Sequence, residues 1–66
     1  MWIPAIGANA GKLWTIIANT GEISLAGLKK LSGLDDRQLF MALGWLARED
    51  KVRFSQAKAR VLVELK

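Results

Sequence analysis

Apolar residues recur at helical spacing along the first part of the chain. The first such stretch occupies the i, i+3, i+4 and i+7 positions of one helix face, with Ala10, Leu13, Trp14 and Ile17. This pattern predicts an amphipathic helix over about 8–19. Asn19-Thr20-Gly21 is a typical helix stop, because glycine readily adopts the left-handed conformation that ends a helix. Trp14 is expected in the core, because it lies on the inward stripe.

Two further helices are predicted from leucine stripes that follow capping residues. Ser24 is a good N-cap for a short helix over 25–32 that ends at Ser32-Gly33. Asp35 is a good N-cap for a third helix over about 35–49. The stripes are Leu25, Leu28 and Leu31 in the short helix and Leu39, Leu43 and Leu46 in the third. Glu22-Ile23-Ser24, before the short helix, could add a minor strand to a later sheet.

The hydrophobic period changes from 3.6 to 2 at Lys51. The inward positions of the predicted strands are Val52, Phe54, Val61, Val63 and Leu65. Alternation of this kind predicts two half-buried strands that form a hairpin over about 51–65. The loop is expected at 56–59, although this segment contains no Gly, Asn or Pro. The 66 residues therefore predict one mainly α domain, a three-helix bundle with a small antiparallel sheet at its C-terminal end.

The segment from Asp35 to Val52 resembles the helix-to-hairpin region of winged helix domains. Together with 21–34 it covers a whole helix-turn-helix motif, two helices joined by a tight turn that contains glycine. The full chain is similar to a family of small stand-alone bacterial and archaeal winged helix-turn-helix proteins of unknown function. Gly11-Lys12-Leu13-Trp14 and the segment 42–49 carry this resemblance. It implies that the third helix and the hairpin, or wing, contact DNA.

The residue types present argue against catalysis and against a bound cofactor or metal. The chain contains no Cys and no His, so the commonest general base and the commonest metal ligands are missing. Asp35 and Asp36 are adjacent and are explained by helix capping. No glycine-rich phosphate loop is present, and no small-molecule substrate is evident. We therefore expect a binding protein rather than an enzyme. With no apolar run of about 20 residues and no signal-peptide pattern, we expect no membrane association and a cytoplasmic location.

Charge favours a nucleic-acid partner. The net charge is +4, and residues 48–66 contribute most of it. Positive charge near a polyanion gives salt-sensitive, sequence-independent binding to phosphates. The candidate contacts to double-stranded DNA are Lys29, Lys30, Arg37, Gln38, Arg53, Lys58 and Arg60. An ordinary solvated surface would explain the same charges, and charged side chains also protect the edge of a hairpin from unwanted pairing.

An apolar group on the third helix supports a different role. Phe40, Met41 and Trp45 are expected to face outward, where a DNA-reading helix usually carries polar residues. Exposed aromatic residues of this kind mark protein interfaces, and Trp2 is a fourth candidate for such a contact. Trp45 folded over the hairpin and Trp2 packed back on the domain are the alternatives. The sequence thus favours a DNA-binding, transcription-regulator-like module that acts as a homodimer. A protein-interaction module without DNA binding stays open beside it.

Overall fold

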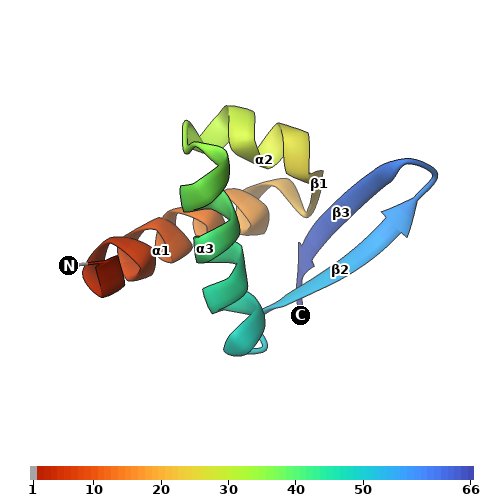
Figure 1. Ribbon diagram of the computed structural model, residues 1–66. Coiled ribbons are helices and arrows are strands. Elements are labelled where there is room, and N and C mark those ends of the chain that lie inside the picture. The colour runs from red at the N-terminus through yellow and green to blue at the C-terminus, as the bar shows by residue number, and fades with distance from the viewer. Residues whose placement is uncertain (1) are drawn as a thin grey trace.

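The computed structural model describes the backbone of residues 2–66 and the side chains of residues 5–66. In chain order the elements are α1 (Trp2–Thr20), β1 (Glu22–Ser24), α2 (Leu25–Ser32), α3 (Asp36–Arg48), β2 (Val52–Ala57) and β3 (Arg60–Leu65). The strands form one antiparallel sheet in the order β1-β3-β2. Figure 1 shows α1 and α3 crossing each other, with the hairpin of β2 and β3 extending away from them. The predicted fold class is confirmed.

The first helix is longer than its hydrophobic pattern predicts. It begins at Trp2 rather than near residue 8, so Pro4 falls in its first turn. Proline is tolerated there, because the amide hydrogen that it lacks would have no acceptor within the helix. The predicted stop is confirmed, since α1 ends at Thr20 and Gly21 has a φ of 91°.

Side-chain caps fix the ends of α2 and α3 as predicted. The hydroxyl of Ser24 accepts a hydrogen bond from the amide of Gly27 at 3.1 Å, and Gly33 ends α2 with a φ of 71°. The carboxylate of Asp35 accepts from the amide of Gln38 at 2.8 Å. The side chain of Gln38 in turn accepts from the amide of Asp35, which completes a capping box. These caps fix where α2 begins and ends and where α3 begins, and they leave a short turn at 33–35 between the two helices.

One hydrophobic core lies between the three helices and the base of the sheet. Its buried members are Ala10, Leu13, Ile17, Ile23, Leu28, Leu39, Ala42, Leu43, Leu46, Val52 and Val63. Two residues of the predicted stripes do not join it. Trp14 is 43% exposed, because Leu13 and Ile17 occupy the centre of the buried face of α1 and Trp14 lies on its flank. Leu31 of α2 is 61% exposed.

The hairpin is tighter and more exposed than its sequence predicts. β2 continues to Ala57, which pairs with Arg60, so the turn consists of Lys58 and Ala59 alone. Lys58 takes the left-handed conformation with a φ of 57°, a role that glycine or asparagine usually fills. Phe54 is 45% exposed although Val63, directly opposite it, is fully buried, because β2 is an edge strand and the core covers the central strand β3 at this level.

Candidate functional site

The face of α3 that points away from the core is a continuous stripe. The buried stripe of α3 contains Leu39, Ala42, Leu43 and Leu46. Because successive helical residues are about 100° apart, the opposite side carries the residues that we call the outer stripe: Arg37, Met41, Gly44 and Arg48. Phe40 and Trp45 lie on the two flanks of this stripe. No atom lies within 4 Å of the position that a Cβ on Gly44 would occupy, so the middle of the stripe is open.

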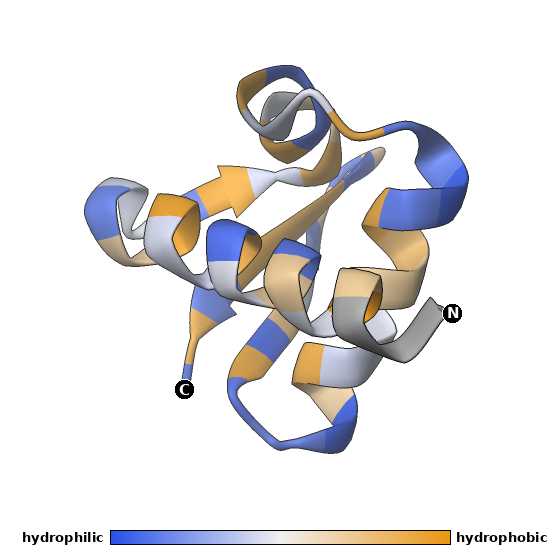
Figure 2. Ribbon diagram, turned by 90° about the vertical axis from the view of Figure 1, so that its left-hand side faces the viewer, coloured by the Kyte–Doolittle hydropathy of each residue, from blue (hydrophilic) through white to orange (hydrophobic). Residues whose placement is uncertain are grey.

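Arginines stand at the two ends of the outer stripe. Arg37 and Arg48 are eleven residues apart in the sequence, which corresponds to about 16 Å along a helix axis. Figure 2 shows α3 hydrophilic at both ends and more hydrophobic between them. The guanidinium of Arg48 lies 6.0 Å from the ring centroid of Trp45, at the outer limit of a cation–π contact. Arg48 is not among the contacts predicted from the sequence, although its spacing of three helical turns from Arg37 is the signal that indicates it.

Three of the seven predicted DNA contacts are engaged within the domain. The ammonium group of Lys29 lies 2.7 Å from the carboxylate of Asp36, which joins α2 to α3. Arg53 lies 3.5 Å from Glu64 across the β2–β3 pair. Gln38 belongs to the capping box of α3. Because Lys29 and Arg53 are each paired with a carboxylate and Gln38 is held in a cap, these side chains are less available to bind a ligand.

The other predicted cations, Lys30, Lys58 and Arg60, are like Arg37 exposed and form no ion pair within the described residues. Lys58 is in the hairpin turn and Arg60 begins β3. Arg60 lines a shallow hollow with the first residues of α2 rather than with α3. The candidate cations without an ion pair therefore form two groups, one on α2 and α3 and one at the hairpin tip.

The predicted apolar group is split by the helix geometry. Phe40 is 55% exposed on the flank of α3 that carries Asp36. Met41 is exposed, whereas Trp45 is half-buried against the core on the other flank. The side chain of Trp2 lies outside the part of the chain that the structure describes. Trp45 of α3 and the exposed Trp14 of α1 line a second hollow, which lies between these two helices.

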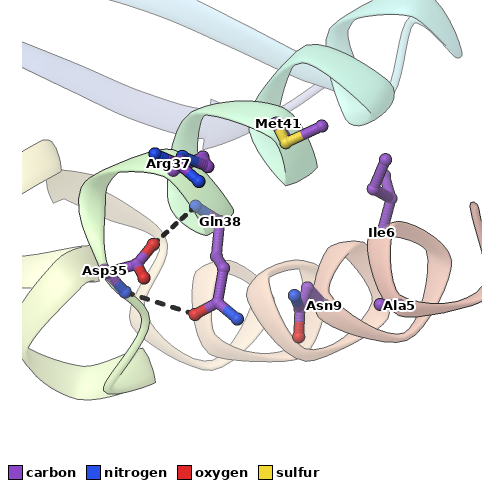
Figure 3. Close-up of a pocket in the computed structure, with 7 residues that line it drawn as sticks. All are labelled: Ala5, Ile6, Asn9, Asp35, Arg37, Gln38 and Met41. Atoms are coloured by element: carbon purple, nitrogen blue, oxygen red, sulfur yellow. Dashed lines mark hydrogen bonds between the residues drawn. The ribbon is translucent and has the colours of Figure 1, made fainter. Parts of the chain in front are cut away.

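A hollow of about 340 Å³ separates the start of α3 from the first half of α1. Figure 3 shows Asp35, Arg37, Gln38 and Met41 on one side of it and Ala5, Ile6 and Asn9 on the other. The two hydrogen bonds between Asp35 and Gln38 hold those side chains to the helix end.

In the described residues no buried side-chain polar atom lacks a partner and no acidic cluster could hold a metal ion. No helix in the described chain is long and apolar enough to cross a membrane.

The crossed helices, the tight turn between α2 and α3 and the two-stranded wing define a winged helix domain. The family described as winged helix-turn-helix domain (DUF2582) matches residues 1–65, and the chain belongs to this family. An uncharacterized protein of Methanocaldococcus jannaschii is 36% identical to the chain and matches 100% of it and 96% of its own length. A protein of Bacteroides thetaiotaomicron, known from a solution NMR structure, superimposes with a TM-score of 0.88 at 32% identity. That match covers 98% of this chain and 79% of the other.

Proposed function

We propose that this chain is a non-catalytic, cytoplasmic module of the transcription-regulator type that binds double-stranded DNA as a homodimer. The observation that carries the proposal is the outer stripe of α3. It places two arginines without carboxylate partners among the described residues on either side of a glycine. Membership of a winged helix family supports this function, because in winged helix proteins the same helix enters the major groove.

The stripe suits the shape of a duplex. The major groove is about 12 Å wide and admits an α-helix. Arg37 and Arg48, about 16 Å apart along α3, reach phosphates beside the groove when the helix lies in it. Gly44 lets the helix backbone come close to the base edges, since it adds no side chain. Met41 offers apolar contact to a thymine methyl group.

Contacts of this kind favour affinity over sequence reading. Arginine–phosphate pairs position a protein on DNA but carry no sequence information. The polar side chain best suited to read a base from α3, Gln38, is used in the capping box. The proposed module therefore binds duplexes with modest sequence preference and strong salt dependence.

The test is fluorescence anisotropy with a labelled random duplex at about 50 and about 200 mM salt. The variant R37A/R48A removes both ends of the outer stripe. We expect it to weaken binding at low salt and to reduce the slope of log affinity against log salt by about two, one for each lost phosphate contact. The control is K12A, which removes an exposed cation of α1, outside α3 and the wing. An R37A/R48A protein with the wild-type slope and affinity would disprove the α3 assignment.

The exposure of Phe40 favours a second candidate, a protein-interaction module that uses α3 without DNA. The substitution F40K separates the two functions. It adds a cation beside the outer stripe, so a DNA-binding module keeps or gains duplex affinity. An interface that depends on the aromatic ring loses its partner instead. Tighter duplex binding by F40K than by the wild type supports the DNA-binding function. If neither protein binds the duplex, the result supports the protein-interaction function.

A further inference from the structure

The hairpin has one edge without a strand partner. In the sheet order β1-β3-β2, one side of β2 pairs with β3 and the other side pairs with no strand of the described chain. β1 has three residues, whereas β2 has six, and all of β2 after Val52 is exposed. An edge of this length is a template for pairing with another chain.

The hydrogen-bond pattern fixes which residues of β2 offer their backbone to that edge. The amide of Lys66 donates to the carbonyl of Lys51, so these two residues are a hydrogen-bonded pair. Such pairs alternate along an antiparallel ladder, and Arg53, Ser55 and Ala57 therefore also bond to β3. The intervening residues point their N–H and C=O groups to the open edge, and these are Val52, Phe54 and Gln56.

We propose that two copies of this chain pair through their β2 edges, antiparallel and centred on Phe54, to form one six-stranded sheet. In this register Phe54 faces Phe54 of the second copy, and Val52 faces Gln56 of that copy. It is the symmetric register in which all three outward residues of each strand bond to outward residues of the other. The proposal names the interface of the homodimer proposed above and rests on that part of the proposed function.

Side-chain chemistry agrees with this register. Each half-exposed Phe54 ring gains an aromatic cross-strand neighbour on the core side of the sheet. On the other side Arg53 lies opposite Ser55 of the second copy, so no cation faces a cation. The charge of Arg53 is also balanced by Glu64 within its own chain.

The hairpin tip is cationic, and antiparallel pairing keeps the tips of the two copies apart. The tip carries Lys58 and Arg60, whereas at the base Asp50 is paired with Lys66 of its own chain. Antiparallel pairing places Asp50 of one copy opposite Lys58 of the other, and the twofold axis repeats this contact. That axis is perpendicular to the sheet, so the helices of both copies lie on the same face of it. The dimer therefore presents two winged helix units on one side.

The first test is sedimentation of the protein without DNA from about 10 µM to about 1 mM, because a small interface gives weak association. We expect concentration-dependent dimers. Since residue 54 faces itself, F54K and F54E should each weaken the dimer by about tenfold or more through like-charge repulsion. An equimolar mixture of F54K and F54E should restore it. Circular dichroism checks that both variants fold, which the exposure of Phe54 leads us to expect.

Cross-linking tests the register independently of any stability change. The chain has no Cys, so F54C introduces the sole thiol. Hydrogen-bonded pairs have Cα atoms about 5.5 Å apart, within the range of a disulfide, and F54C should give covalent dimers on mild oxidation. S55C is the matched control, because residue 55 is offset from its own copy and should cross-link poorly.

Three outcomes overturn the proposed interface. They are a wild-type monomer up to about 1 mM, a dimer that F54K does not weaken, and equal cross-linking of F54C and S55C. If the β2 edge binds an extended peptide rather than a second copy, the protein stays a monomer, which is the first of these outcomes. Because sedimentation is done without DNA, failure here leaves the duplex titration of R37A/R48A as a separate test of DNA binding.

Discussion

The helical bundle and the hairpin contain similar proportions of hydrophobic residues but use them differently. Within the described chain, the three helices contribute eight of the eleven buried hydrophobic residues, and the hairpin contributes only Val52 and Val63. Phe54 and Val61 point the same way as these two residues and remain exposed. The bundle therefore provides most of the stability of the fold. The hairpin is attached to the core through Val52 and Val63, and its tip and its β2 edge are available to partners.

Truncation of a core leucine has the largest expected effect and tests the contrast directly. L39A removes a buried side chain of α3 and should cost about 2–5 kcal/mol of unfolding free energy. A domain of this size has roughly 3–5 kcal/mol in total, so much of the L39A protein should be unfolded. F54A in the hairpin should cost about 1 kcal/mol or less. Urea unfolding followed by circular dichroism measures both, and equal losses would show that the hairpin supports the fold as strongly as the bundle.

Loss of a helix cap should have an intermediate effect within the bundle. D35A removes the acceptor for the amide of Gln38 and should destabilise the protein by about 1 kcal/mol. D36A is the matched control, because it leaves the cap intact and breaks only the exposed ion pair with Lys29. We expect a loss below about 0.5 kcal/mol for D36A, typical of an exposed pair. A D36A protein as unstable as D35A would contradict the capping box as the main determinant of this helix end.

The smallest expected effect is a gain of stability in the hairpin. Lys58 occupies a left-handed conformation that costs most residues about 1 kcal/mol, and K58G should recover up to that amount. A59G is the control, because Ala59 is not among the residues with positive φ, and glycine there should destabilise slightly. Thermal unfolding measures both variants. A decrease in the melting temperature of K58G would show that the lysine side chain contributes contacts that outweigh its backbone strain.

The capping residues predicted where α2 begins and ends and where α3 begins. The caps at Ser24 and Asp35 and the left-handed Gly33 were expected from their residue types, because a cap depends on a side chain and an amide two or three residues away. The start of α1 was predicted several residues late. Its first turns extend beyond the buried stripe, so hydrophobic periodicity gave no signal there.

Exposure was harder to predict than secondary structure. Trp14 follows Leu13 and is expected beside it in the core, yet it is 43% exposed and lines a hollow between α1 and α3. Phe54 has the alternation of a half-buried strand, but it lies on the edge strand β2 and stays exposed while Val63 opposite it is buried. Periodicity shows which face of an element is apolar, and it does not show how far a neighbouring element covers that face.

The set of cations available to contact DNA also differs from the predicted set, because it depends on packing between elements. Lys29 and Arg53 are predicted contacts because of their charge, and the fold brings each beside a carboxylate seven or eleven residues away in the chain. Arg48 was overlooked, and helix geometry places it in line with Arg37. The role of each cation thus depends on its neighbours in space.

The sequence by itself determined the order of helices and strands, their caps and the mildly basic character of the chain, because these depend on nearby residues and on composition. Only the tertiary structure decided which apolar side chains are covered, which cations stay unpaired and which edge of the sheet is open. Those features depend on contacts between residues far apart in the chain, and such contacts exist only after the helices and the hairpin have packed together.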